Sequence, residues 1–254
     1  MRLFLELISL KKCIYDKMYF HKLQGFIYNV LRETEYGVLH NKPGYKFFCF
    51  SNIFPINDMK PGDSKNLIIS SPDKIFIKLL KEKLIEFIDS KKPLNIGEMQ
   101  FEIKEIKKFS IKLNSSRIKL ISATPIIIKI PEKNYEKYKI PEKYRKKRYV
   151  YWRPQYDFNA FLKQLEENIF KKYKDFYKTE IKEFPIFEGF KFNSPANPRV
   201  VIKGREYSLV GSYWEFYFSG LNHDKQKRKI LEFAIDCGFG EKNAYGFGFI
   251  NKII

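Results

Sequence analysis

The sequence predicts an α+β fold made of two tandem ferredoxin-like domains, each with the element order β-α-β-β-α-β. Strand and helix patterns follow this order in the first half of the chain, and the second half repeats it less cleanly. With 254 residues, 44% of them hydrophobic, the chain is also long and apolar enough to form two cores. We therefore expect one domain over residues 1–122 and a second over residues 123–254.

The elements of the first half follow from hydrophobic spacing. Partial alternation predicts a strand over Arg2–Leu10, and a period near 3.6 residues predicts a helix over Tyr19–Glu33. Ser70 or Ser71 can cap a second helix that runs to Asp89. Its expected buried face consists of Ile75, Leu79, Leu80, Leu84 and Ile88. The remaining strands are expected at Lys46–Phe54, Asn66–Ser70, Met99–Ile106 and Phe109–Ile121.

The second half carries two helix patterns between strand-like runs. Asp157 can cap a helix that extends to Tyr177, and a last helix from Asn222 ends at Gly238, a residue suited to a helix C-terminus. The strands are expected at Pro125–Ile130, Arg148–Trp152, Phe187–Phe192, Arg199–Lys203, Tyr213–Phe218 and Phe247–Ile254.

The charge of the chain indicates a polyanionic partner. The 48 Lys and Arg residues exceed the 29 Asp and Glu residues, which gives a formal charge of +19. The segment Lys129–Arg153 concentrates this excess, with ten basic and three acidic residues. Cations bind phosphates and exposed rings can stack on unpaired bases, although each ring could equally belong to the core. The rings in question are Tyr135, Tyr138, Tyr144, Tyr149, Tyr151 and Trp152.

Other classes of protein have little support. Cys13, Cys49 and Cys237 lie far apart, without the paired spacing of a zinc site or a disulfide framework. The three histidines form no metal-binding pair, so no metal or cofactor is expected. The longest run without a formal charge, Phe47–Asn57, is too short for a membrane span. The N-terminus has no secretory signal pattern, and we expect a cytoplasmic protein.

His40 and Lys46 are the candidates for chemistry. His40 lies in a loop rich in Gly, Asn and Pro, six residues before Lys46. Imidazole exchanges a proton near neutral pH, and a lysine can neutralise the charge that develops on a phosphorus centre. From this spacing alone, an ordinary polar loop residue and a strand-edge charge are the simpler interpretation.

The most specific pattern is a doubled glycine block near the C-terminus. Gly238-Phe239-Gly240 and Gly246-Phe247-Gly248 flank five residues that include Lys242, and the block follows a basic amphipathic helix. Glycine allows close backbone approach, and successive amides can cradle a phosphate. The spacing fits neither a dinucleotide fingerprint nor a Walker A loop.

With this block the chain resembles the CRISPR-associated repeat-processing endoribonucleases of the RAMP superfamily. The runs Val201–Arg205 and Ser212–Gly220 are also similar, as is the opening with its first strand, Gln24–Tyr28, the loop histidine and Phe47–Ser51. The resemblance implies two ferredoxin-like domains and metal-independent cleavage of precursor CRISPR RNA within each repeat. The ribose 2′-OH would attack the adjacent phosphate and leave 2′,3′-cyclic phosphate and 5′-OH ends.

The resemblance also implies roles for individual residues. His40 matches the loop histidine that acts as general acid or base, and Lys46 matches the lysine that stabilises the transition state. Tyr28 is the best match to a tyrosine that some members use, and Tyr36 competes with it. The RNA-binding residues implied are Gly238, Gly240, Lys242, Gly246 and Gly248, with Lys203 and Arg205 from the upstream run.

The implied partner is a CRISPR repeat RNA, either single-stranded or a hairpin. Two alternatives remain open: a catalytically inactive RNA-binding subunit of a CRISPR effector complex, and a ribosome- or tRNA-associated protein of the same fold. The first alternative often lacks the loop histidine, and the second would not need the doubled glycine block. A homodimer would suit an unstructured repeat.

Overall fold

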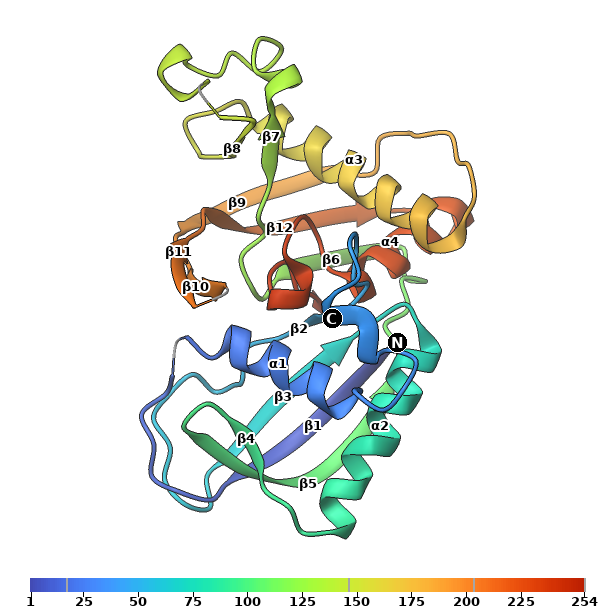
Figure 1. The fold of residues 1–254 in the computed structure, drawn as a ribbon. Helices are drawn as coiled ribbons and strands as arrows, with labels where there is room; N and C mark the ends of the chain where they lie inside the picture. Colours follow the sequence, from blue (N-terminus) through green and yellow to red (C-terminus); the bar gives the residue numbers. More distant parts are fainter. Residues whose placement is uncertain (17, 146, 203, 254) are drawn as a thin grey trace.

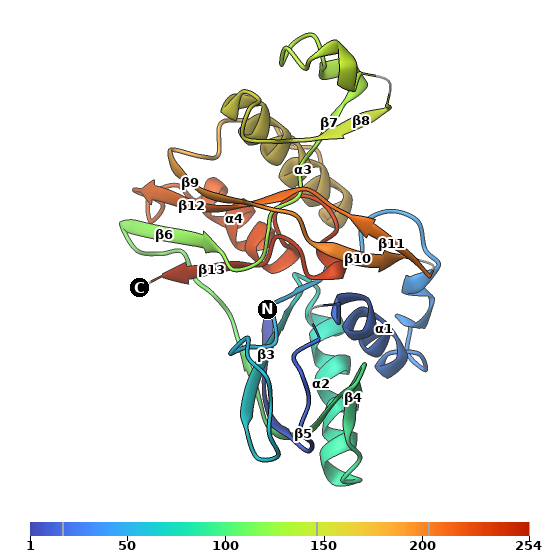
Figure 2. The same ribbon diagram turned by 90° about the vertical axis from the view of Figure 1, so that its left-hand side faces the viewer.

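The computed structural model describes residues 1–16, 18–145, 147–202 and 204–253, with the backbone only for His40 and Ile202. Two antiparallel sheets, each with its own hydrophobic core and its own helices, lie one above the other (Figures 1 and 2). Both sheets have the ferredoxin-like order, in which the first strand of the unit lies between the third and the fourth. The predicted fold of two tandem ferredoxin-like units is confirmed.

The N-terminal sheet has the order β2-β3-β1-β5-β4. β1 pairs antiparallel with β3 on one side and with β5 on the other, and β4 adds a short hairpin strand at the edge. The elements of this unit are β1 (Arg2–Ser9), α1 (Phe20–Val30), the 3₁₀ helix η1 (Gly37–His40), β2 (Cys49–Phe50), β3 (Ser64–Ser70), α2 (Lys74–Asp89), β4 (Leu94–Ile96) and β5 (Met99–Phe109).

The C-terminal sheet has the order β13-β6-β12-β9. Its elements are β6 (Arg117–Ser122), α3 (Phe158–Tyr177), β9 (Gly189–Ala196), β12 (Gly211–Ser219), α4 (Lys225–Cys237) and β13 (Ile250–Ile253). Two strand pairs lie outside this sheet, namely β7 (Lys129–Pro131) with β8 (Tyr149–Tyr151) and β10 (Arg199–Ile202) with β11 (Arg205–Ser208). The 3₁₀ helices are η2 (Glu132–Asn134), η3 (Glu142–Tyr144) and η4 (Asn243–Tyr245).

The strand pairing corrects the expected domain boundary. β6 pairs with β12 and β13, so it is the first strand of the second unit. The long strand β5 occupies the remaining edge of β1 along its whole length, which leaves no place there for β6. The chain therefore changes sheet between Phe109 and Arg117, and not between residues 122 and 123.

Helix α2 begins later than the sequence predicted, and its buried face keeps Leu80 and Leu84 of the predicted set but is shifted from the rest. Asp73, not a serine, is its N-cap and accepts hydrogen bonds from the amides of Ile75 and Phe76. The buried residues are Phe76, Ile77, Leu80 and Leu84, whereas Ile75 is 56% exposed and Ile88 is 38% exposed. Phe76 is drawn inward because its ring stacks on Phe48, with 5.2 Å between the ring centroids.

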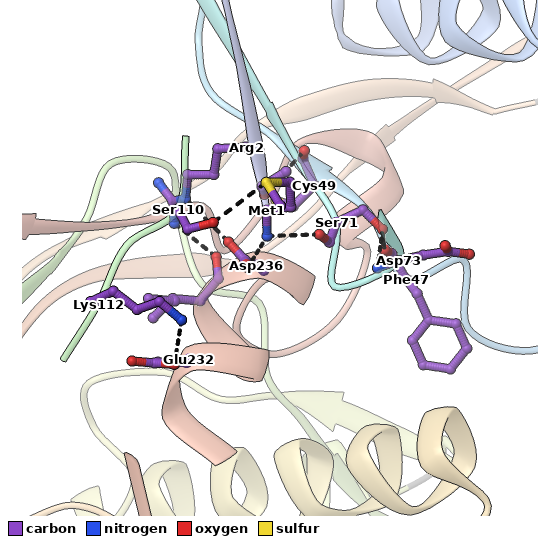
Figure 3. Close-up of polar contacts among 12 residues, drawn as sticks. Met1, Arg2, Phe47, Cys49, Ser71, Asp73, Ser110, Lys112, Glu232 and Asp236 are labelled. Atoms are coloured by element: carbon purple, nitrogen blue, oxygen red, sulfur yellow. Dashed lines mark hydrogen bonds and ion pairs between the residues drawn. The ribbon is translucent and has the colours of Figure 1, made fainter. Parts of the chain in front are cut away.

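A buried arginine joins the two units. The guanidinium of Arg2, at the start of β1, donates to the carbonyl oxygens of Ile235 at 2.9 Å and Ile250 at 2.6 Å. It also contacts Asp236, which is paired in turn with the amino group of Met1 (Figure 3). These bonds run from the first strand of one unit to the last helix and last strand of the other. They fix the relative position of the surfaces that form the site described below.

Within the described ranges, no helix combines the length and the hydropathy that a bilayer-spanning segment needs.

Candidate functional site

A pocket of about 430 Å³ lies between the two units. The N-terminal unit lines it with Gln24 and Tyr28 from α1 and with residues 44–48. The C-terminal unit lines it with Lys129, Lys172, Cys237 and residues 240–245 of the glycine block. Of the predicted site residues, the pocket therefore brings together Tyr28, Lys46, Gly240 and Lys242.

Lys46 closes the loop that precedes it. Its ammonium group donates to the carbonyl oxygens of Leu39 and Lys42, so the chain just before and just after His40 is tied to this side chain. Burial lowers the pKa of Lys46, and the positive charge of Lys42 lowers it further. His40 ends η1 within this closed loop, and since only its backbone is described, its catalytic role stays a prediction.

The two candidate tyrosines differ in their surroundings. Tyr28 lines the pocket, its hydroxyl accepts a hydrogen bond from Gln24 at 3.4 Å, and burial raises its pKa to about 12. Tyr28 is therefore protonated at neutral pH and can act as a hydrogen-bond donor. The hydroxyl of Tyr36 instead donates to Asp73, the N-cap of α2, and Tyr36 is not among the residues that line the pocket.

The four glycines of the block have positive φ angles and are buried against protein atoms. A Cβ added at Gly248 would lie 1.9 Å from the carbonyl oxygen of Phe239, and one at Gly246 would lie 2.3 Å from the ring of Phe50. Glycine is required here because the two arms of the block, and the block and β2, approach each other closely. Gly238, Gly246 and Gly248 do not line the pocket, so their own surfaces are not presented to a ligand there.

A buried lysine that the sequence did not single out holds the block in place. Lys172 of α3 is 1% exposed, and its ammonium group donates to the carbonyl oxygen of Gly238 and to Oδ1 of Asn243, both at 2.7 Å. The amide nitrogen of Asn243 in turn donates to the carbonyl oxygens of Phe239 at 3.0 Å and Phe247 at 2.8 Å. Burial lowers the pKa of Lys172, although Cys237 and Glu241 raise it.

The lining of the pocket is strongly basic. It contains four lysines, Lys46, Lys129, Lys172 and Lys242, and one acidic residue, Glu241. Burial lowers the pKa of Lys242, and the neighbouring Lys129 lowers it further. A pocket in which several lysines are partly desolvated attracts an anion such as a phosphodiester.

The structure places neither of the two predicted RNA-binding residues of the run Val201–Arg205 in this pocket. Arg205 lies on the exposed strand β11, outside the lining of the pocket, and Lys203 lies outside the described residues. The hairpin of β10 and β11 instead packs beside α1. Contact between Arg205 and RNA therefore stays a prediction.

Comparison with known proteins identifies the family of the chain. Residues 110–252 match the model of the C-terminal part of the CRISPR-associated protein Cas6. The chain is 40% identical to the CRISPR-associated endoribonuclease Cas6 2 of Methanocaldococcus jannaschii, with both chains fully covered. It is 27% identical to the CRISPR-associated endoribonuclease Cas6 of Haloferax mediterranei, over the whole of this chain and 94% of that protein.

Solved structures support the same fold. A structure described as CRISPR-associated protein Cas6 superposes with a TM-score of 0.70 at 22% identity, covering all of this chain and 99% of that one. A structure described as a RAMP protein binding different RNA substrates gives a TM-score of 0.70 at 20% identity, with both chains fully covered. The family match over the C-terminal unit and the relative that is 40% identical from end to end establish that the chain belongs to the Cas6 family of CRISPR-associated proteins.

Proposed function

We propose that this chain is an endoribonuclease that cleaves precursor CRISPR RNA within its repeats without a metal ion. One observation supports this most: the pocket between the units sets Lys46, at the end of the loop that begins at His40, and Tyr28 opposite the glycine block, inside a basic lining. Binding groups and candidate catalytic groups thus come from different units and meet at one place. The named Cas6 relatives are endoribonucleases, and the same activity is the simplest use of this geometry.

The proposed reaction is a transesterification. The ribose 2′-OH loses its proton and attacks the adjacent phosphorus, while the 5′-oxygen of the next nucleotide leaves and takes up a proton. His40 serves as general acid or base in these transfers. Lys46 and Tyr28 donate hydrogen bonds to the phosphate oxygens, where charge accumulates in the transition state. The products carry a 2′,3′-cyclic phosphate and a 5′-OH.

A cleavage assay in EDTA with analysis of the RNA ends tests this proposal. We expect one cut within each repeat, a cyclic phosphate at one new end and a hydroxyl at the other, at the rate seen with added Mg²⁺. RNA that is bound but never cut would identify a silent RNA-binding subunit instead. Cleavage that requires a metal and leaves a 5′-phosphate would contradict the mechanism.

Replacing Lys172 by methionine should slow RNA cleavage, because Lys172 supports the glycine block. The variant removes both bonds from α3 to the block, so Lys242 and the backbone around it are held less precisely. We expect the cleavage rate at saturating RNA to fall by about 10- to 100-fold, the size of effect that misplacement of a bound substrate can have.

The neighbouring residue offers a matched control for this test. Lys171 is 57% exposed and pairs with Glu167 on the outer face of α3, so Lys171→Met should cleave at the wild-type rate. Equal rates for Lys172→Met and the wild type would show that the bonds to Gly238 and Asn243 do not control the geometry of the block.

The assembly state is part of the same proposal. We infer a cytoplasmic enzyme that binds a repeat RNA and forms a homodimer where the repeat is unstructured, with a CRISPR effector complex as a further partner. The mass of the RNA complex, measured by light scattering, tests the dimer directly.

A further inference from the structure

The chain from β7 through β8 to Tyr156 forms a lobe, described over residues 129–145 and 147–156, that projects beyond the C-terminal sheet on the side away from the N-terminal unit (Figures 1 and 2). Two hydrogen bonds help to hold it in place. Within the lobe, the hydroxyl of Tyr135 donates to the carbonyl oxygen of Lys147 at 2.6 Å, and the indole of Trp152 donates to the carbonyl oxygen of Asp157, the N-cap of α3, at 3.0 Å. Apart from Lys129, the described residues of the lobe lie outside the central pocket and take no part in the proposed reaction.

The aromatic rings of the lobe divide into two groups. Tyr135, Tyr138 and Trp152 are at most 5% exposed and belong to the core. Tyr144 and Tyr149 are 38% and 39% exposed. Each of these rings has a lysine ammonium group over it, Lys143 at 5.0 Å from the centroid of Tyr144 and Lys129 at 4.6 Å from that of Tyr149, so a base would stack on the other face.

A second pocket, of about 490 Å³, lies among these exposed rings. Its lining contains four basic residues and no acidic one, and the acidic residues of the lobe, Glu132, Glu136 and Glu142, lie outside it. Positive charge beside exposed tyrosines is the combination that binds the phosphates and stacks the bases of unpaired RNA. The basic residues are Lys143, Lys147, Arg148 and Arg153, all of them exposed.

The second pocket is linked to the central one through β7 and β8. Lys129 lines the central pocket, pairs with Tyr151 across β7 and β8, and places its ammonium group 4.6 Å from the ring centroid of Tyr149. Tyr151 and Tyr245, which line the second and the central pocket respectively, pack against the same small cluster of buried residues. A strand of RNA that leaves the central pocket at Lys129 meets the lobe next.

We propose that the lobe binds an unpaired stretch of the same RNA, on one side of the cleaved bond, by stacking bases on Tyr144 and Tyr149 and neutralising phosphates with the four basic residues. This rests on the proposed function for the identity of the RNA. The lobe would lengthen the footprint of the enzyme and leave the chemistry to the central pocket.

The test replaces Lys143, Lys147, Arg148 and Arg153 together by glutamine. The probe is the repeat RNA with a 2′-deoxyribose at the cleaved nucleotide, so that binding is measured without cleavage. We expect the affinity to fall by at least 10-fold. The slope of log K against log salt should become shallower by roughly 0.7 for each phosphate that the variant no longer neutralises. With unmodified RNA at saturation, the variant should cleave at the wild-type rate.

A control with the same change of charge is available on the N-terminal unit. Lys74 and Lys78 of α2 and Lys107 and Lys108 of β5 lie on the surface of the N-terminal unit, outside both pockets. Their replacement by glutamine should change the affinity less than about 2-fold, because surface charges beyond a Debye length are screened. A lobe variant that binds RNA as tightly as this control would overturn the proposal and leave the lobe to another partner, such as a protein.

The rings are tested separately, together with the side of the RNA that they contact. Tyr149→Leu should weaken binding by about 5-fold or more, as removal of one stacking platform does. Shortening the RNA on one side of the cleaved bond should weaken binding to the wild type but not to the lobe variants. Equal weakening for wild type and variants would refute the contact. If the wild type does not cut RNA at all, the proposed function fails, whereas the binding comparison still decides the lobe.

Discussion

Replacing His40 by alanine is expected to lower the rate of RNA cleavage by about 10²- to 10⁴-fold, the contribution typical of a general acid or base. The affinity for RNA should change little, because phosphate binding depends on the lysines that line the pocket. The measurement is a single-turnover cleavage rate at saturating RNA, beside a binding constant obtained with the 2′-deoxy RNA.

Another histidine supplies the control for this experiment. His223 is exposed near the start of α4, where its ring contacts the Asn222 side chain, and its replacement by alanine should leave the rate unchanged. If His40→Ala cut the RNA at the wild-type rate in EDTA, the proton transfers would have to be assigned to another group. A fall in binding that matches the fall in cleavage would make His40 a binding residue instead.

Replacing Gly248 by alanine is expected to destabilise the protein by about 2 to 5 kcal/mol, which combines the cost of a left-handed backbone with that of overpacking. Gly248 has a φ angle of 73°, and its added Cβ would lie 1.9 Å from a backbone oxygen that cannot move without breaking the block. The amide of Phe239 also donates to the carbonyl oxygen of Gly248 at 2.8 Å. The free energy of unfolding in urea measures the effect.

A substitution at Gly62 separates the cost of the left-handed backbone from the cost of overpacking. Its φ angle is 91°, yet a Cβ added there would meet no atom within 4 Å. Gly62→Ala should therefore cost only about 1 kcal/mol, the conformational part alone. If the two variants were destabilised equally, close packing inside the block would not explain why glycine occurs there.

Local signals in the sequence predicted two of the helix ends correctly. Asp157 caps α3 and Gly238 ends α4, as expected, because a cap depends on a few adjacent residues. That β6 belongs to the C-terminal unit could not be predicted from local signals. The partners of β6 are set by pairing between residues more than 90 positions apart, such as Phe216 with Leu120. A short apolar run in the sequence does not indicate which strand it will pair with.

The residues of the candidate site also differ in whether local sequence patterns could identify them. Lys46, Tyr28 and Lys242 were found because they lie within or beside recognisable motifs, and the structure brings all three to one pocket. Lys172 was missed because a lysine on a helix is ordinarily solvated. The signal that could have revealed it is its position: it follows Leu165 and Ile169 along the buried face of α3, seven and three residues later.

The contacts of Arg2 have a consequence for how the enzyme is made. A ribosome releases the N-terminal unit first, when the acceptors of that guanidinium, on Ile235, Asp236, Ile250 and Asn251, have not yet been synthesised. The glycine block, which forms one wall of the central pocket, also belongs to this last stretch. A nascent chain should therefore be unable to cut RNA until nearly all of it has been translated, which keeps a nuclease inactive while it is still attached to its own messenger RNA.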